Sequence, residues 1–288
     1  MSQDDSKRVP EQADLSPARS VMAWLTDFGL TDGYVGVMKG VALNIAPATQ
    51  LIDITHEIGP QNISAGAWVL ATSYRYFPRG TIFVCVVDPG VGSARRPVAI
   101  HAGGWFFVGP DNGLFHYILH EQAIHTAVLL SNPAYHLPQV SATFHGRDVF
   151  TPVAAHIARG VPLTEMGTVL DPATLVRLDL TPPQRQGEHI FAHIVHIDHF
   201  GNLITSIPLT LVPDLFSSSA AELTFPSRSI RITGRSRFFS GRAGEEQSVQ
   251  PFIYGDSAGY VAVAVRNGNA ARLLEIDQGA VCILRIME

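Results

Sequence analysis

The chain has 288 residues, of which 46% are apolar and 16% are charged, and its formal net charge at pH 7 is -5. These values are ordinary for a globular protein that buries a sizeable core in one large domain or two. The modest acidic charge offers no electrostatic attraction for nucleic acid or an anionic membrane surface, and no apolar stretch is as long as a transmembrane helix. We therefore expect neither nucleic acid nor a membrane as a partner.

The N-terminal segment and the cysteines bear on the cellular setting. Residues 1–20 are polar and of mixed charge, without the apolar stretch of a signal peptide, so we expect them to form a disordered tail. Cys85 and Cys282 are the only cysteines. Each lies in an apolar run, and their wide separation fits reduced thiols better than a disulfide framework. The sequence thus favours a soluble, cytoplasmic protein.

Strand-like and helix-like segments alternate through the first 180 residues. This alternation is typical of an α/β domain with a largely parallel, buried sheet. Two later apolar runs separated by Ala-Gly-Gly predict a hairpin at or near the edge of that sheet. The expected strands are 21–25, 51–54, 81–87, 98–101 and 105–108, and the expected helices are 34–44, 63–77 and 150–159.

Short β-rich runs follow residue 180. Residues 181–187, Thr-Pro-Pro-Gln-Arg-Gln-Gly, have the composition of a linker. Many short strands with Gly, Asn and Ser turns are typical of a small antiparallel barrel or sandwich. We therefore predict an N-terminal domain at 21–180 and a C-terminal domain at 188–288. The expected strands of the latter are 189–197, 203–207, 221–225, 229–233, 252–254, 260–265 and 280–286.

Two aspartates follow the first predicted strand. In open α/β sheets, ligands bind beyond the carboxyl ends of the strands, where Asp27 and Asp32 are expected. Residues 26–36 (TDFGLTDGYVG) contain these two carboxylates and no lysine, which suits hydroxyl groups or a cation better than phosphate. Either aspartate alone is equally well explained as a helix N-cap or turn residue.

Asp88 stands at the end of an apolar run that the sequence predicts to be fully buried. A carboxylate there needs a charged partner or several amide donors, because burying it unpaired is unfavourable. The following Pro-Gly-Val-Gly turn can bring back Arg95 or Arg96 as that partner. A structural ion pair that fixes the loop explains the pattern equally well.

The histidines give weaker indications. His145 lies in TFHGRD, just before a predicted helix, although a lone histidine is more often structural than catalytic. In the predicted strand 189–197, side chains 193 and 196 point to opposite faces, and only His196 and Asp198 share one face. Two ligands on a face do not make a zinc site. No Walker A, G-x-G-x-x-G or G-x-S-x-G motif supports a phosphate, dinucleotide or serine-nucleophile site.

Six motifs together resemble one family. The chain carries, in this order, TDFGLTDGYVGVMKG, DITHEI, VVDPGVGSARRP, VGPDNGL, TFHGRD and IDHFGN. Over about residues 21–288 it closely resembles the S-adenosyl-L-methionine hydroxide adenosyltransferases, which are relatives of the fluorinases and chlorinases. The resemblance implies an N-terminal α/β domain with a largely parallel sheet and a smaller C-terminal antiparallel β-barrel. It also implies a homotrimer with its sites at subunit interfaces.

The implied reaction is hydrolysis of S-adenosyl-L-methionine to adenosine and L-methionine, by in-line attack of water or hydroxide on ribose C5′. The substrate is the only small molecule that this chemistry needs, so we expect no metal and no further cofactor. The hydroxide-using branch carries an Asp–Arg–His set, which falls on Asp88, Arg95 and His145. Asp88 would orient Arg95 and accept a hydrogen bond from the water or, with His145, help remove its proton. Arg95 would stabilise hydroxide character on the attacking oxygen, and His145, if neutral, could serve as the base. Which of the three takes the proton stays open.

The resemblance also assigns substrate contacts. Asp27 matches the partner of the ribose diol, Asp32 and Asp198 face the amino-acid end of the substrate, and Ser257 contacts the methionine moiety. The positions that match adenine contacts are Phe200, Asn202, Phe239, Asn269 and Ala270.

This chain departs from the fluorinases at several positions. They place arginine at the position of Ala258 and tryptophan at that of Gln61, and many relatives have Ala-Asp where Ser-Gly follows Phe239. Gly146 is compatible with either branch. Two alternatives to hydrolysis stay open, namely a halogenase of the chlorinase type and a non-catalytic sensor of S-adenosyl-L-methionine or adenosine.

Overall fold

The computed structural model describes residues 20–237, 239 and 250–287, and its contacts divide the chain into two compact units. The first comprises the described residues up to Glu57, Phe77–Pro110 and Gln122–Thr174. The second comprises Ile58–Tyr76, Asp111–Glu121 and the described residues from Leu175. Residues 1–19 of the predicted tail lie outside the described residues. The predicted domain limits stay a prediction.

A seven-stranded sheet forms the centre of the first unit, in the order β2-β1-β3-β5-β4-β6-β7. The first four strands in this order are parallel, and β4, β6 and β7 are antiparallel to their neighbours. The predicted α/β domain with a largely parallel sheet is therefore confirmed. Its strands are β1 (Val21–Thr26), β2 (Gln50–Thr55), β3 (Ile82–Val86), β4 (Pro97–Ala102), β5 (Trp105–Pro110), β6 (Ile124–Leu129) and β7 (Thr168–Val169).

The predicted hairpin is present as β4 and β5, but it lies inside the sheet. The reason is β6, which pairs with the far side of β4 and was not predicted from the sequence. Its segment, IHTAVL, is only partly buried, and its apolar residues do not form the continuous run that marks the central strands.

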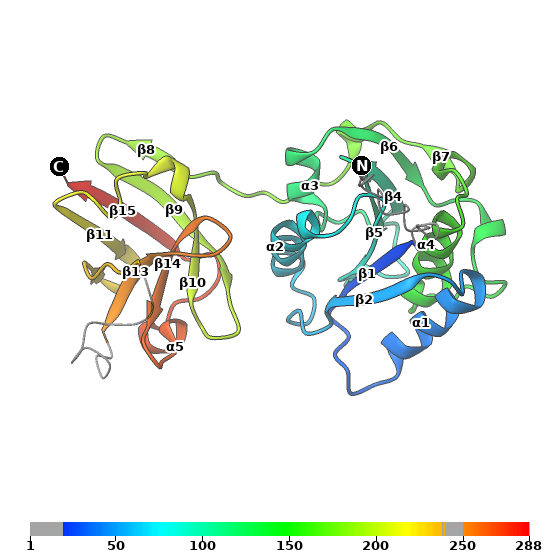
Figure 1. Cartoon of the computed structure of the whole chain (residues 1–288), viewed down its shortest axis with the longest axis horizontal. Coiled ribbons are helices and arrows are strands. Elements are labelled where there is room, and N and C mark those ends of the chain that lie inside the picture. The colour runs from blue at the N-terminus through cyan, green and yellow to red at the C-terminus, as the bar shows by residue number, and fades with distance from the viewer. Residues whose placement is uncertain (1–19, 238, 240–249, 288) are drawn as a thin grey trace, which may run out of the picture. The chain divides into compact units, whose positions relative to one another are not determined.

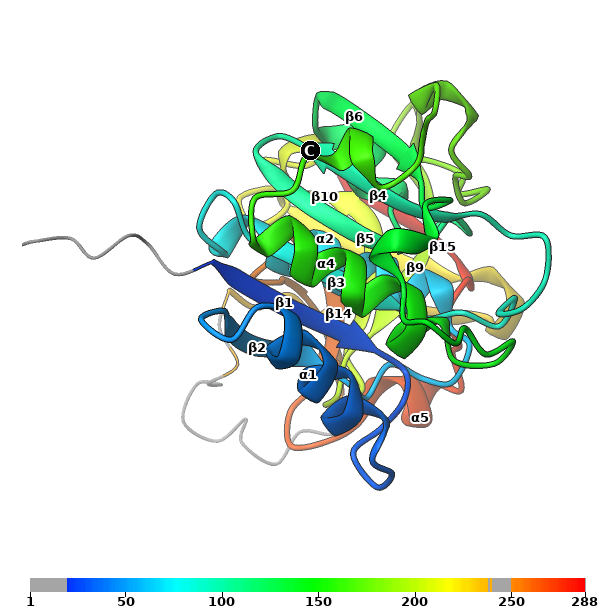
Figure 2. The same cartoon turned by 90° about the vertical axis from the view of Figure 1, so that its right-hand side faces the viewer.

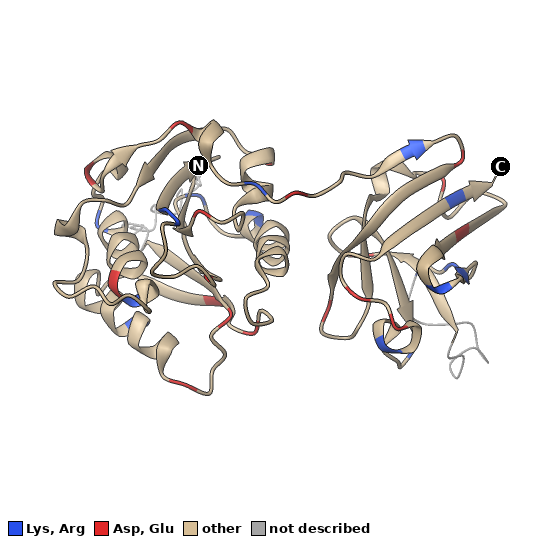
Figure 3. Ribbon diagram, turned by 180° about the vertical axis from the view of Figure 1, so that it is seen from behind, with Lys and Arg blue, Asp and Glu red and all other residues tan. Residues whose placement is uncertain are grey.

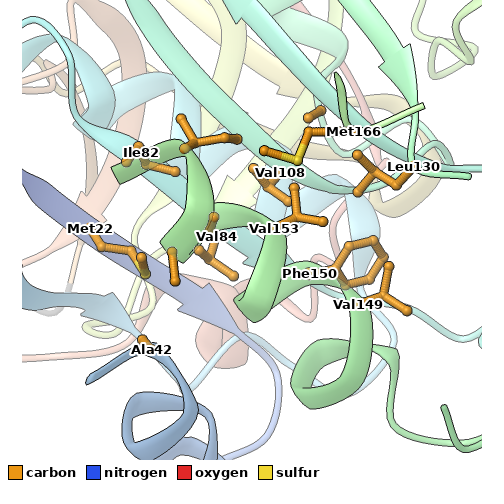
Figure 4. Packing of buried hydrophobic residues seen from close by; sticks show 14 of the residues in the cluster. Met22, Ala42, Ile82, Val84, Val108, Leu130, Val149, Phe150, Val153 and Met166 are labelled. Carbon is orange, nitrogen blue, oxygen red and sulfur yellow. The ribbon is translucent and has the colours of Figure 1, made fainter. Parts of the chain in front are cut away.

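Two helices cover one face of this sheet. Helix α1 (Tyr34–Ile45) and helix α4 (Thr151–Ala158) lie side by side on it (Figure 2). Met38 of α1 is fully buried in the same cluster as Val153 of α4 and Val84 of β3. Figure 4 shows Val153 and Val84 in this cluster. Burying a side chain of this size contributes about 1.5–3 kcal/mol, so this cluster anchors the strands whose ends carry the polar residues described below.

The second unit contains a nearly closed antiparallel barrel (Figure 1). Its strands follow the order β12-β11-β15-β9-β10-β14-β13, and β8 pairs with β9. The segment after β12 hydrogen-bonds to β13, because Ile253 N donates to Gly234 O and Ser236 N donates to Ile253 O. This pairing brings the two ends of the sheet together, so the barrel expectation is confirmed.

Strand β8 (Gln184–Gln186) was not predicted, because it lies within residues 181–187, which have the composition of a linker. The limits of the other strands agree with the sequence to within about two residues. They are β9 (His189–Ile197), β10 (Leu203–Pro208), β11 (Ala220–Phe225), β12 (Ile230–Ile232), β13 (Pro251–Gly255), β14 (Tyr260–Val265) and β15 (Val281–Met287). The helices of this unit are α2 (Ile63–Ser73), α3 (His116–Glu121) and α5 (Ala270–Leu274). The predicted helix 63–77 ends earlier, in a 3-10 turn at Tyr74–Tyr76.

Acidic and basic residues are scattered over both units in the described part of the chain (Figure 3). Both cysteines, Cys85 and Cys282, are buried free thiols. Within residues 20–237, 239 and 250–287, no helix is both long and apolar enough to cross a membrane.

Buried histidines predict a protein that loses stability in acid. Burial, with the charges of His120 and Arg177, lowers the pKa of His116 to about 4, and an unfolded histidine has a pKa near 6.5. As the pH falls below about 6.5, the unfolded state takes up protons that the folded state does not, so the free energy of unfolding falls with it. Burial likewise lowers the pKa values of His101, His136, His145, His156, His193 and His196.

Urea unfolding at several pH values between 7.5 and 4.5 measures this slope. We expect His116→Asn to reduce it, while the same substitution at exposed His199 leaves it unchanged. A free energy of unfolding that stays constant over this range would contradict the prediction.

Candidate active site

The loop after β3 returns the chain on itself. Ser93 fixes the return, since its hydroxyl donates to Gly90 O at 2.7 Å and accepts from Arg95 N at 3.2 Å. Gly92 has φ +78°, and a Cβ there would lie 2.4 Å from a backbone oxygen of a neighbouring loop, so only glycine fits. This turn brings the Arg95 side chain back over Asp88.

Asp88, Arg95 and His145 lie in direct contact. Arg95 Nε donates to both carboxylate oxygens of Asp88, at 2.9 and 3.0 Å, and Nη2 donates to Oδ2 at 2.5 Å. The same Nη2 lies 2.8 Å from His145 Nδ1. The side chains of Arg95 and Asp88 are only 9% and 5% exposed. Arg96 instead donates to the backbone oxygen and the hydroxyl of Thr174. Of the two arginines that the sequence offered, Arg95 is therefore the partner of Asp88.

The contacts fix the protonation of His145. A guanidinium only donates hydrogen bonds, so Nδ1 must accept, and the proton of the neutral ring is then on Nε2. Burial and the positive charge of Arg95 lower the pKa of His145, and the nearby carboxylates offset this only in part. Its neutral form is therefore present at pH 7, with Nε2–H as a donor. The expectation that His145 serves as base stays a prediction, and this tautomer must change before Nε2 can accept a proton.

The loop that carries His145 is held by a second ion pair. Asp148 is fully buried and accepts from Arg147 Nε at 2.6 Å and from Ser141 N at 2.8 Å. Burial alone raises the pKa of Asp148, but these hydrogen bonds outweigh it and lower the pKa overall. The chain continues as a π-helical turn, Gly146–Phe150, that leads into α4. A Cβ on Gly146 would lie 3.2 Å from the sulfur of Met38, so the position favours glycine.

Asp27 lies at the same edge of the sheet as Asp88. Thr26 is in register with Val86 of β3, and the two aspartates follow at the carboxyl ends of these neighbouring strands. Asp27 is half-buried, whereas Asp32 is exposed in the loop before α1.

An aromatic cluster adjoins Asp27. The rings of Phe28, Tyr34 and Phe144 pack edge to face, with centroids 5.3 to 6.0 Å apart. They line a cavity of about 430 Å³ together with Arg147, whose guanidinium lies 5.1 Å from the Phe144 ring centre. Phe144 immediately precedes His145 in the chain, but Asp88, Arg95 and His145 are not among the residues that line this cavity.

The second unit contains a larger cavity of about 1200 Å³. Ala270, also assigned to the site by sequence, is fully buried at the start of α5 and does not line this cavity. The other substrate residues predicted in this unit all line it, namely Asp198, Phe200, Asn202, Phe239, Ser257 and Asn269.

Asp198 shapes the turn that bears these residues. Its Oδ1 accepts from the backbone nitrogens of Phe200 and Asn202, both at 2.9 Å, and its Oδ2 accepts from Asn202 Nδ2 at 2.7 Å. Asn269 caps α5 by accepting from Arg272 N at 2.8 Å. A carboxylate has about four acceptor positions, so three turn contacts leave Asp198 about one position for a ligand.

Tyr254 and Asp256 are among the cavity residues that sequence reasoning missed. The Phe239 ring packs against Tyr254, with centroids 4.9 Å apart. Burial, with the negative charge of Asp198, raises the pKa of Asp256. Asp256 directly follows β13, so the position of an acidic residue after an apolar strand was the available signal.

The histidines of β9 have separate surroundings. His196 stacks on Trp68 with ring centroids 6.4 Å apart, and His193 Nδ1 lies 3.5 Å from the Ser206 hydroxyl. Within the described residues, no group of three or more His, Cys, Asp and Glu side chains is placed to hold a metal ion.

Comparison with known proteins gives consistent matches across the chain. The family model described as SAM hydroxide adenosyltransferase N-terminal domain matches residues 22–167, and the corresponding C-terminal model matches residues 192–283. A protein of Salinispora arenicola named (R)-S-adenosyl-L-methionine hydrolase is 39% identical over 263 residues, covering 90% of this chain and 95% of that protein. A fluorinase of Actinoplanes sp. is 28% identical over 269 residues, covering 85% and 90%.

A solved structure shares the fold. The crystal structure of an uncharacterized conserved protein from Thermotoga maritima has a TM-score of 0.83 and 32% identity, covering 92% of this chain and 99% of that chain. Together with the two family models, this likeness extends over both units. The chain belongs to the SAM hydroxide adenosyltransferase family.

Proposed function

We propose that this protein hydrolyses S-adenosyl-L-methionine to adenosine and L-methionine. The observation that carries the proposal is the buried contact of Asp88, Arg95 and His145 at the carboxyl edge of the sheet. Relatives that cover nearly the whole chain are named (R)-S-adenosyl-L-methionine hydrolase, and we extend the (R) configuration to the substrate of this chain.

The chemistry requires one well-placed water molecule. A bond forms between the water oxygen and ribose C5′ while the C5′–S bond breaks, and the sulfur keeps the electron pair. The sulfonium thereby becomes a neutral thioether, and one proton is released. Because this leaving group needs no acid, catalysis consists of aligning the water and stabilising its developing hydroxide character. Arg95 and the His145 Nε2–H supply positive potential and a hydrogen bond, and Asp88 fixes Arg95.

The remaining predicted residues bind the substrate in this proposal. Asp27 accepts hydrogen bonds from the ribose diol, since a carboxylate suits two neighbouring hydroxyl donors. Asp32, Asp198 and Ser257 face the methionine part. The adenine lies among Phe200, Asn202, Phe239 and Asn269, next to the fully buried Ala270 at the start of α5. The reaction as written needs no metal or further cofactor.

We also propose that the protein assembles as a homotrimer with its sites at subunit interfaces. Large apolar side chains that are exposed in the single chain support this, because such groups commonly mark protein–protein contacts. Leu30, Tyr34 and Val37, around the start of α1, are 67%, 50% and 47% exposed. Light scattering after gel filtration measures the assembly, and a monomer would contradict it. Buried free thiols fit a cytoplasmic setting.

An incubation of the purified protein with S-adenosyl-L-methionine, with and without chloride, tests the reaction. Chromatography is expected to show adenosine and methionine in equal amounts under both conditions, with faster turnover of the (R) diastereomer. A chlorinated nucleoside formed only with chloride would favour the halogenase reading, which the fluorinase similarity keeps open. Ligand binding without turnover would favour a sensor.

A further inference from the structure

A polar chain, buried at Thr26 and His56 and exposed at Asp53, lies behind the turn that carries Asp27. Thr26, the last residue of β1, is fully buried, and its Oγ1 lies 2.8 Å from His56 Nδ1. His56 Nε2 lies 3.0 Å from Asp53 Oδ1, and Asp53 Oδ2 accepts from Lys39 Nζ at 2.6 Å. These residues come from β1, β2, the loop after β2, and α1.

The chemistry of the groups sets the direction of this chain. Burial raises the pKa of Asp53, but the hydrogen bond from Lys39 and the neighbouring His56 ring outweigh burial and lower this pKa overall, so the carboxylate is ionised. A carboxylate only accepts, so the His56 proton that faces it is on Nε2, and in the tautomer with this single ring proton Nδ1 accepts from the Thr26 hydroxyl. The Thr26 oxygen in turn accepts from Phe28 N at 3.3 Å.

His56 thereby holds both ends of the Asp27 turn. Its side chain fixes the Thr26 hydroxyl before Asp27, and its backbone oxygen accepts from Gly29 N, after Asp27, at 2.8 Å. The His56 side chain is only 2% exposed, so the ring has little freedom to reorient. The backbone of the turn that carries Asp27 is thereby held on both sides before any ligand arrives.

We propose that Lys39, Asp53, His56 and Thr26 form a positioning relay that orients the Asp27 carboxylate toward the ribose hydroxyls. The proposal rests on the ribose contact of Asp27 in the proposed function, and it assigns the four residues no contact with substrate. Its consequence is specificity: the relay strengthens binding of a nucleoside only when the 2′- and 3′-hydroxyls are present. If the four residues only stabilised the fold, they would contribute equally to the binding of nucleosides with and without these hydroxyls.

The test measures binding of adenosine and of 2′,3′-dideoxyadenosine to the full chain by calorimetry. Thr26→Val keeps the shape of the side chain and removes the hydroxyl. We expect it to raise the dissociation constant for adenosine about tenfold, the usual scale for a lost buried hydrogen bond, and to leave that for dideoxyadenosine unchanged. Thr26→Ser, which restores the hydroxyl, is expected to recover adenosine affinity.

Thr81→Val is the matched control. Thr81 is also a buried threonine of the first unit, 1% exposed, and its hydroxyl has no hydrogen-bond partner among the described residues. It precedes β3 at the opposite end of the sheet, so neither affinity should change. The relay would be overturned if Thr26→Val lowered the affinity for both nucleosides equally, or if it changed neither affinity. If the wild-type protein binds both nucleosides with equal affinity, Asp27 does not contact the ribose diol, and the relay is wrong as well. That result would not contradict the proposed hydrolysis, which the turnover of S-adenosyl-L-methionine in the incubation above tests separately.

Discussion

We expect Asp88→Asn to lower kcat for S-adenosyl-L-methionine by about a thousandfold, the upper scale for losing one preorganised electrostatic contact in an active site. The dissociation constant for adenosine should change by less than about threefold, because Asp88 contacts Arg95 and not the nucleoside. An amide has the size of the carboxylate, but its NH2 group faces the guanidinium and its charge is gone. Arg95, which donates three hydrogen bonds to Asp88, then loses the contacts that aim it. Single-turnover rates and calorimetry measure the two quantities separately.

Stability has to be followed in the same variant. Removing one partner of a buried ion pair typically destabilises a protein by about 3–5 kcal/mol, so the rates must be taken well below the unfolding temperature. Glu275→Gln is the control, because its pair with Arg228 is exposed at both side chains, 72% and 49%, and it should change neither kcat nor adenosine binding. A parallel fall of turnover and adenosine affinity in Asp88→Asn would show that the role assigned to Asp88 is wrong.

Long apolar runs made most of the fold predictable. The segments of β3 and β9 are continuous or strictly patterned, so their limits follow from the sequence almost to the residue. Short elements escaped, because two-residue β7 and five-residue α5 are too brief to show any periodicity. The helix α5 depends on its Asn269 cap and on packing against the barrel, which only the folded chain supplies.

The site was predictable where its residues are neighbours in the chain. Asp88 and its returning arginine stand seven residues apart, and a glycine turn between them indicates the contact. Whether Arg95 or Arg96 makes it depends on the exact course of that turn, because adjacent side chains point in different directions. The relay behind Asp27 was not predictable, since Lys39, Asp53 and His56 meet Thr26 only after three elements have packed.

Asp198 is a position where sequence reasoning leaves two explanations. Its motif predicts a substrate contact, and the structure also shows three hydrogen bonds to its carboxylate from its own turn. A motif that must fold a turn and one that must bind a ligand favour the same residue types, aspartate, glycine and asparagine. The two explanations separate only when the donors to the carboxylate are known.

The second large effect is expected in the pH dependence of kcat. Arg95 Nη2 donates to His145 Nδ1 at 2.8 Å, which requires an unprotonated Nδ1. Protonation of Nδ1 would place its N–H against the N–H of Arg95 Nη2. Two donors cannot share a hydrogen bond, so His145 would move away from Arg95. Burial and the Arg95 charge lower the pKa of His145, so the neutral form predominates at pH 7 and is lost only below pH 6.5. We therefore expect a flat kcat above neutrality and, below the pKa, a fall of about tenfold per pH unit at saturating substrate.

His145→Asn separates this titration from acid unfolding. The asparagine oxygen takes the place of Nδ1 as acceptor and does not titrate, so the acid limb should disappear, although the missing Nε2–H lowers kcat at pH 7. Circular dichroism at each pH identifies any loss of folded protein. Protonation of the other buried histidines would cause such a loss in both the wild-type protein and the variant. An acid limb that survives unchanged in folded His145→Asn would assign the titration to another group. A midpoint above 6.5 in the wild-type protein would contradict the sign of the shift, because it would mean that the pocket favours imidazolium beside Arg95.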